Sequence, residues 1–130
     1  MADPQRFLPL AADGLQIAPT LAAGELRIVM SGAVEARDPG AILNPYWSQV
    51  DEELVKGGIR RVELDLRVLA FMNSSGILTL VKWISQARAH PPAAAYSVAV
   101  RYDREITWQR TNVPILAKLA PGVVRLIEAG

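Results

Sequence analysis

Three stretches of the chain alternate apolar and mostly polar side chains with a period of two, and this feature most constrains the fold. The stretches are residues 25–31, 61–67 and 95–101, and the clearest reads RVELDLR over 61–67. Because successive side chains of a strand point to opposite faces, each stretch predicts a strand with one buried face and one wetter face. Residues 14–18 and 123–127 are shorter candidates for strands.

Helical patterns separate the predicted strands. Apolar residues recur every three or four positions over about 40–56 and over about 74–89. A third helical region follows Asp103, which suits an N-cap, and continues to Leu119. Strands and helices therefore alternate along the chain.

Prolines set the expected boundaries of two of these helices. Asn44 suits an N-cap and Pro45 a first helical position, which predicts that the first regular helix begins there. Residues 39–43 would then form a lead-in turn. Asn112 and Pro114 predict that the third helical region is split into two short helices.

The elements follow the order β-β-α-β-α-β-α, with a final β if 123–127 is a strand. Alternating strands and helices predict parallel strands joined by right-handed crossovers. A sheet that is buried on both faces has continuous apolar strands, whereas these strands alternate. We therefore predict a two-layer α/β fold, with a mixed, mostly parallel sheet and helices on one face. Residues 14–130 form this single domain, and residues 1–13, with Pro4 and Pro9, form an N-terminal arm or an edge segment.

Composition argues against several classes of function. The net charge of +1 lacks the basic excess of proteins that neutralise nucleic-acid phosphates. The absence of cysteine excludes thiolate chemistry, and a single histidine, His90, among scattered acids argues against a zinc or iron site. No apolar run reaches the roughly 18 residues of a membrane span, and the first residues lack the apolar region of a signal peptide. We therefore expect a cytoplasmic protein without a cofactor that binds neither nucleic acid nor membrane.

The most informative segment is VELDLRVLAFMNSSGILTLVKWI, residues 62–84. A strand ends at Leu66, a short apolar linker over 68–72 follows, and the sequence NSSG leads directly into a helix. This segment resembles the STAS family, whose anti-sigma-factor antagonists carry a strand, then F-M-D-S-S-G-[LI], then a helix. The matching residues are Phe71, Met72, Ser74, Ser75, Gly76 and Ile77. The order of elements also resembles that of the family, so the resemblance covers most of the chain.

One position departs from the family pattern, because Asn73 stands where the family usually has Asp. A related branch of the same fold, which regulates biofilm formation and second messengers, is similar in having Asn before the phosphorylated hydroxyl. In the family, the first hydroxyl after this position is phosphorylated. The resemblance therefore implies Ser74 as the phosphorylated residue, with Ser75 as the second choice.

The resemblance also implies a bacterial partner-switching regulator of signal transduction, and not an enzyme. By resemblance, a GHKL-type serine kinase that is also the anti-sigma factor phosphorylates Ser74, and a metal-dependent serine phosphatase restores the hydroxyl. In the family, the unmodified form sequesters the anti-sigma factor and frees a sigma factor, which regulates transcription. In the Asn-bearing branch, the unmodified form instead activates a diguanylate cyclase, and the sequence leaves both outputs open.

The residues around Ser74 suit such a switch. An added phosphate would meet free N–H groups and the positive dipole end of the helix, worth roughly 0.3–1 kcal/mol at an exposed site. Asn73 can cap the helix, and Gly76 permits close approach by a kinase or partner backbone. On the helical wheel Gly76, Thr79 and Trp83 lie off the predicted buried stripe, so a part-exposed tryptophan could anchor a partner. The predicted partner-binding residues are Asn73, Ser75, Gly76, Thr79 and Trp83.

Plainer interpretations stand beside these. Asn and Ser are favoured at helix caps in any protein, so the NSS sequence also suits a cap without regulation. A tryptophan such as Trp83 is more often a half-buried packing residue than an interface anchor. The basic residues Arg101, Arg104 and Arg110 follow a strand end and could share the edge that carries the switch serine, or could form an ordinary surface.

Two other classes of function are alternatives to the switch. A permanent scaffold subunit of a lipid-transport or stress-sensing complex would use the same fold without phosphorylation. A hydrolase would need an activated nucleophile, but the chain has no G-x-S-x-G motif. His90 would lie at the far end of the helix that begins near Ser74, roughly 20 Å or more away at the helical rise per residue.

Overall fold

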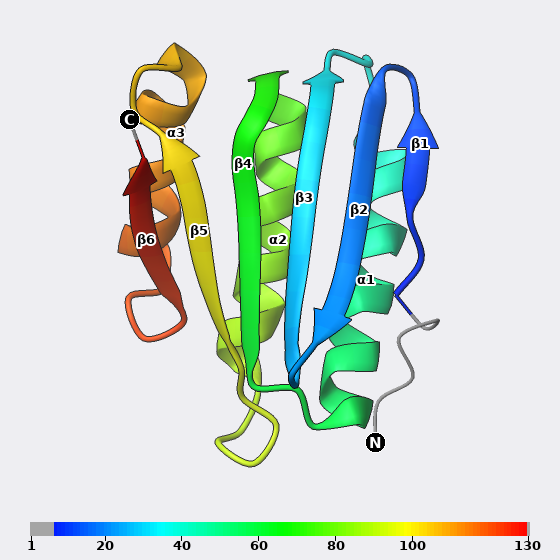
Figure 1. Ribbon diagram of the computed structural model, residues 1–130, viewed down its shortest axis with the longest axis vertical. Coiled ribbons are helices and arrows are strands. Elements are labelled where there is room, and N and C mark those ends of the chain that lie inside the picture. Colours follow the sequence, from blue (N-terminus) through cyan, green and yellow to red (C-terminus); the bar gives the residue numbers. More distant parts are fainter. Residues whose placement is uncertain (1–6, 130) are drawn as a thin grey trace.

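The computed structural model describes residues 7–129 and is built on a six-stranded sheet in which the strands lie in chain order (Figure 1). The strands are β1 (Leu10–Ala12), β2 (Leu15–Ala22), β3 (Glu25–Val34), β4 (Arg61–Met72), β5 (Ser97–Asp103) and β6 (Val124–Ala129). The helices are α1 (Gly40–Gly57), α2 (Ser74–Ala89) and α3 (Thr107–Leu119), and they cover one face of the sheet. The predicted two-layer α/β fold is confirmed.

The sheet is mixed, as predicted. Strands β1, β2 and β3 pair antiparallel, and their two hairpin turns place Asp13-Gly14 and Ala23-Gly24 at positive φ. Strands β3, β4, β5 and β6 pair parallel, each joined to the next through a helix. The carboxyl ends of the parallel strands therefore meet at one edge, which is the upper end of the molecule in Figure 1.

The predicted N-terminal arm is only partly described, because residues 1–6 lie outside the described part of the chain. Within the remainder, β1 forms the edge strand beside β2. Phe7 is buried, and the Tyr46 hydroxyl on α1 donates to the carbonyl of Leu8 at 2.9 Å. Residues 7–12 are thus fastened to both layers of the domain.

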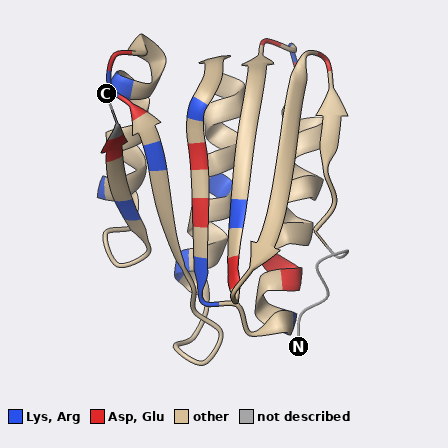
Figure 2. Cartoon of the chain, in the orientation of Figure 1, with Lys and Arg blue, Asp and Glu red and all other residues tan. Residues whose placement is uncertain are grey.

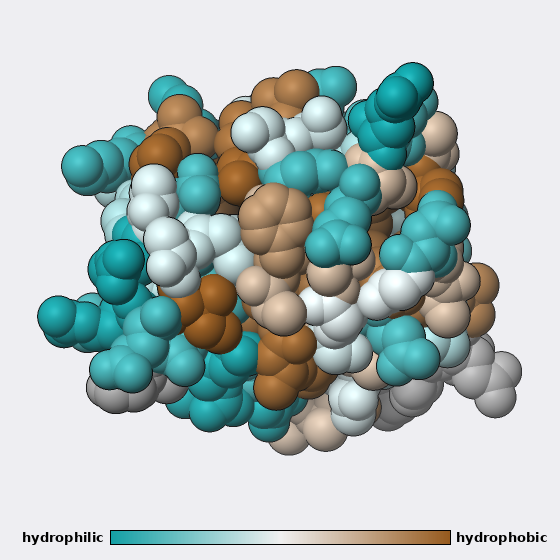
Figure 3. Space-filling view, turned by 90° about the horizontal axis from the view of Figure 1, so that it is seen from above, coloured by the Kyte–Doolittle hydropathy of each residue, from teal (hydrophilic) through white to brown (hydrophobic). Residues whose placement is uncertain are grey.

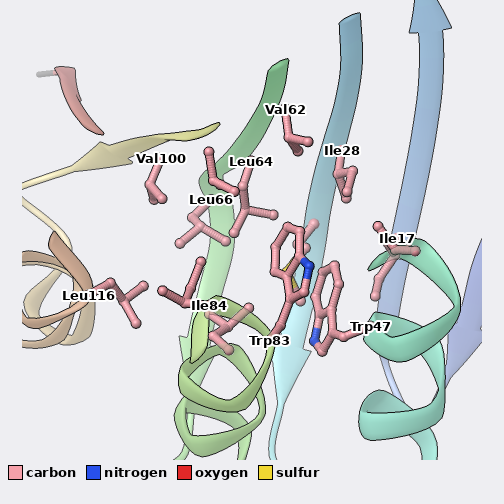
Figure 4. Packing of buried hydrophobic residues seen from close by; sticks show 14 of the residues in the cluster. Ile17, Ile28, Trp47, Val62, Leu64, Leu66, Trp83, Ile84, Val100 and Leu116 are labelled. Carbon is pink, nitrogen blue, oxygen red and sulfur yellow. The ribbon is translucent and has the colours of Figure 1, made fainter. Parts of the chain in front are cut away.

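The core between the two layers contains a stacked pair of tryptophans (Figure 4). The rings of Trp47 on α1 and Trp83 on α2 lie 4.6 Å apart between centroids and 6° from parallel. The Trp83 indole N–H donates to the Tyr96 hydroxyl at 2.9 Å, and that hydroxyl donates to Asp51 at 2.5 Å. Burial, and then Asp51, raises the pKa of Tyr96, so the phenol stays a donor. This network ties both helices to the segment before β5.

Three predicted helix boundaries are wrong. Helix α1 begins at Gly40 with Pro45 inside it, and α3 is one helix with Pro114 inside it. The N-cap of α3 is Ile106 and not Asp103, which ends β5. A proline removes one hydrogen bond, to the carbonyl four residues earlier. Those carbonyls belong to Ala41 and Arg110, which lie at exposed positions where water can solvate the oxygen. Burial of the opposite helix face can then hold each helix together.

The apolar stretch 68–72, predicted as a linker, continues β4 to Met72. The pairing with β3 shifts register twice, between Val29 and Ser31 and again after Gly32, so β4 contains bulges. Pairing with β5 stops at Asp65. Because of these irregularities, some backbone carbonyls of β4 accept no hydrogen bond from the neighbouring strands.

Side chains of α3 donate hydrogen bonds to those carbonyls. The Gln109 side-chain amide donates to the carbonyls of Leu66 and Leu69 at 2.6 and 3.0 Å, and the Trp108 indole N–H donates to Leu69 at 2.9 Å. The Gln109 side-chain oxygen accepts from the N–H of Asp103 at 2.8 Å. This fully buried glutamine therefore joins β4, β5 and α3 where the ladder between the two strands ends.

The face of the sheet away from the helices carries charge, and Figure 2 shows acidic residues in the middle of β4 with basic residues on either side. Asp65 on this face is only 3% exposed. Its carboxylate pairs with Arg27 at 3.0 Å and with Arg67 at 2.8 Å. Burial opposes ionisation of Asp65, but hydrogen bonds from Arg67 and Arg27 outweigh it and lower its pKa to about 2.

The lowered pKa of Asp65 predicts an acid-dependent loss of stability. Ionised Asp65 contributes fully to the free energy of unfolding when the pH is above its pKa in the unfolded chain. This contribution is lost as the pH falls through its lower pKa in the folded protein. We expect the stability difference between wild type and Asp65→Asn to shrink by about 2 kcal/mol between about pH 4 and about pH 2. Urea denaturation of both proteins at neutral and acid pH measures this difference. A difference that does not change with pH would contradict the prediction.

Candidate functional site

The candidate site lies at the junction between β4 and α2. Asn73 caps the helix there, as predicted. Its side-chain oxygen accepts from the N–H of Gly76 at 2.8 Å. Its side-chain NH₂ donates to the carbonyl of Ala36, in the segment between β3 and α1, at 2.9 Å. A carboxylate could accept the first bond but could not donate the second. The asparagine, which stands where the family has aspartate, therefore adds a hydrogen bond between the β4–α2 junction and the segment between β3 and α1.

Ser74 and Ser75 occupy the first two positions of α2 and are both exposed. The N–H groups of Gly76 and Ile77 bond to Asn73. Those of Ser74 and Ser75 have no hydrogen-bond partner within residues 7–129. Free N–H groups at the positive end of a helix dipole favour an anion. The local geometry can therefore accept a phosphate on either hydroxyl.

Gly76 is buried, and the prediction that it admits a kinase or partner backbone is wrong. A Cβ atom at this position would lie 2.8 Å from Met72 Cγ and 2.8 Å from Val34 Cγ1, both side-chain carbons of the core. The missing side chain thus lets α2 start close against the ends of β3 and β4.

The expectation that Thr79 and Trp83 lie off the buried face of α2, on which their prediction as partner-binding residues rests, is also wrong. Thr79 is buried and its hydroxyl donates to the carbonyl of Gly76 at 2.7 Å. Trp83 is 0% exposed. Both the sheet and α1 cover α2, so its buried face is wider than the stripe that periodicity predicted. Ile77 and Val81, two of the apolar residues that recur over 74–89, are only partly buried.

Exposed apolar side chains flank the serine pair, and the sequence analysis missed them. Phe71, three residues before Ser74, is 44% exposed because β4 is bulged there. Leu78, one helical turn after Ser74 and on the same side of α2, is 51% exposed. We call Phe71, Ser74, Ser75 and Leu78 the entry surface. Figure 3 looks onto this end of the molecule and shows hydrophobic patches between hydrophilic ones.

The three arginines that could have joined the serine pair have other contacts. Arg101 pairs with Glu63 at 3.2 Å on the open face of the sheet, and Arg104 pairs with Glu128 at 2.8 Å. Arg110 donates to a backbone carbonyl at 3.4 Å. Within the described residues, no hydrogen bond or ion pair joins them to the entry surface.

Other catalytic and binding groups are not brought to this site. His90 lies just past the opposite end of α2, where its ring contacts Asp51 at 2.8 Å. In the described part of the chain, no group of three or more His, Asp or Glu side chains is placed to hold a metal ion. None of the helices described is both long and apolar enough to span a bilayer.

No protein-family model matches the chain, and no curated protein matches its sequence. A chain in the crystal structure of diguanylate cyclase SiaD in complex with its activator SiaC from Pseudomonas aeruginosa is similar, with a TM-score of 0.70 and 21% identity over 94% of this chain and 99% of that chain. SiaC of Pseudomonas aeruginosa has a TM-score of 0.67 and 21% identity over 94% of this chain and 98% of that chain. An anti-sigma factor antagonist from Mycobacterium paratuberculosis has a TM-score of 0.57 and 18% identity over 85% of this chain and 86% of that chain. The chain therefore has a STAS-like fold.

Proposed function

We propose that this protein is a protein-binding switch in which bare Ser74 permits a partner to dock on the entry surface and phosphorylation of Ser74 releases it. The observation that carries the proposal is the exposed serine pair at the start of α2, between exposed Phe71 and Leu78. Ser75 is the second choice for the phosphorylated residue. Asn73 positions the pair through its two hydrogen bonds.

Charge explains why phosphorylation would separate the partners without unfolding the domain. A phosphoserine carries about −1.5 to −2 charges, which the free N–H groups at the helix start can stabilise. A partner packed on Phe71 and Leu78 would have to desolvate that charge without a matching cation. The folded domain thus tolerates the modification and the docked complex does not.

A diguanylate cyclase is the first partner to test. The structures that contain SiaC, an activator of the cyclase SiaD, match this chain over more of its length than the anti-sigma factor antagonist does. Asn73 also agrees with the Asn-bearing branch that the sequence resembles. A GHKL-type serine kinase that acts as an anti-sigma factor is the second partner to test. In both cases a serine kinase that binds ATP and metal phosphorylates Ser74. A metal-dependent serine phosphatase then removes the phosphate.

Substitution of Ser74 tests the binding step. Ser74→Asp is expected to weaken partner binding by about tenfold or more, because a charge must be desolvated, whereas Ser74→Ala should bind like wild type. Biolayer interferometry with each purified candidate partner measures the dissociation constants. Ser85→Asp places the same charge at an exposed position later on α2 and should leave binding unchanged. Equal affinities for wild type, Ser74→Ala and Ser74→Asp would contradict the switch.

The modification step needs a separate experiment. Incubation with a candidate kinase and ATP, followed by intact mass measurement, should add one phosphate that is absent from Ser74→Ala. A phosphate that is lost only in Ser75→Ala would move the site to the second hydroxyl. No phosphate with any candidate kinase would favour a permanent scaffold subunit.

A further inference from the structure

A second site lies between α1 and α2, apart from the entry surface. The two helices line a pocket of about 450 Å³, a volume typical of small-molecule sites. Its lining includes Asn44 and Trp47 from α1 and Thr79, Lys82 and Gln86 from α2. Neither Ser74 nor Ser75 lines it.

The pocket contains a buried donor without a partner. Trp47 is 1% exposed, yet its indole N–H has no hydrogen-bond partner within residues 7–129. The other two indoles are bonded, Trp83 to the Tyr96 hydroxyl and Trp108 to the carbonyl of Leu69. In Figure 4 the Trp47 nitrogen lies on the helix side of the stacked pair, in the space between α1 and α2. A buried N–H without a partner is unfavourable, so an acceptor at this point would be stabilising.

A second residue of the lining carries an unpaired acceptor. The side-chain oxygen of Asn44, one helical turn before Trp47, is also buried and has no partner among the described residues. A ligand that satisfies both atoms must therefore accept one hydrogen bond and donate another.

The charge of the pocket further limits the class of ligand that could bind. Lys82 is the one charged residue in the lining and is exposed. It forms no ion pair within the described part of the chain. One cation without an acidic neighbour suits a single negative charge, whereas a polyphosphate is usually held by several cations and N–H groups.

We propose that this pocket binds a small monocarboxylate that carries a hydroxyl group. The side chains that cover the Trp47 indole N–H and the Asn44 side-chain oxygen must move aside to admit the ligand, because both atoms are buried. The carboxylate then accepts hydrogen bonds from the Trp47 indole N–H and the Lys82 ammonium, and the hydroxyl donates to the Asn44 side-chain oxygen. The apolar body of the ligand packs against Val81 and the edges of the tryptophan pair. This site does not depend on the proposed switch, because it uses neither Ser74 nor a protein partner.

Nitrogen-15 NMR of the whole chain tests the proposal through the three indole N–H signals. The probes are 3-hydroxybutyrate, mandelate and 4-hydroxybenzoate, with their neutral amides as controls. We expect at least one acid to shift the Trp47 signal to saturation, with a Kd of about 1 mM or tighter, while the Trp108 signal does not move. Trp47→Phe identifies the signal because it removes that N–H.

Lysine variants separate the pocket from general attraction of anions. Lys82→Met, at an exposed position that should not disturb folding, is expected to weaken binding of the acid about tenfold. Lys118→Met removes an exposed lysine on α3 and should leave the affinity unchanged. The proposal is overturned if none of the acids gives a saturable shift of the Trp47 signal, or if Lys82→Met binds as tightly as wild type.

Discussion

Trp83→Ala is expected to lower the free energy of unfolding by about 3–5 kcal/mol, the usual cost of deleting a fully buried aromatic ring. Trp83 is 0% exposed and stacks on Trp47, so alanine leaves a cavity beside the second indole. The change also removes the N–H that donates to the Tyr96 hydroxyl. Urea denaturation followed by circular dichroism measures the loss.

Leu78→Ala is the matched control, because Leu78 lies on the same helix and is 51% exposed. Its stability should stay within about 1 kcal/mol of wild type, while partner binding on the entry surface weakens. If Trp83→Ala were as stable as Leu78→Ala, the indole would not be the core residue that the structure shows.

Gly32→Ala is expected to destabilise the protein by about 2–5 kcal/mol. Gly32 has φ +87°, a conformation that costs an L-residue roughly 1–2 kcal/mol. An added Cβ would also lie 2.0 Å from the carbonyl oxygen of Gly14, in the turn between β1 and β2. That backbone cannot move away freely, because the same oxygen accepts the N–H of Ala33 at 3.2 Å. Overpacking of this kind adds a further 1–3 kcal/mol.

Gly24→Ala isolates the conformational part of this effect. Gly24 has φ +76°, and an added Cβ would meet no atom within 4 Å. Thermal or urea denaturation should therefore show a loss of about 1–2 kcal/mol for Gly24→Ala, clearly less than for Gly32→Ala. Equal losses in the two variants would show that the close approach of Gly14 to β3 does not contribute to the destabilisation by Gly32→Ala.

The sequence predicted the features that depend on local pattern. Period-two alternation identified β3, β4 and β5, and their polar positions indicated one open face of the sheet. The cap at Asn73 was also predictable, because it depends on a hydrogen bond to a residue three positions later. Its second bond, to Ala36, joins residues 37 positions apart and left no trace in the local sequence.

Features that depend on packing between elements could not be predicted in this way. The bulges of β4 depend on its pairing with β3, and they expose Phe71 beside the serine pair. The buried position of Trp83 depends on α1, which covers a side of α2 that the helical wheel treated as free. Gln109 looks like an ordinary polar residue until the unpaired carbonyls of β4 are known.

The arrangement of strands in chain order has a consequence for how the protein folds during synthesis. Every strand pairs only with the strands before and after it in the chain, so each pairing closes a loop of at most one helix and its connections. The parallel pairings join residues far apart in the sequence, such as Glu25 and Arg61, and are therefore expected to form more slowly than the two hairpins. As the chain leaves the ribosome, each new strand can add to an edge that already exists. No strand has to insert between two that were made earlier.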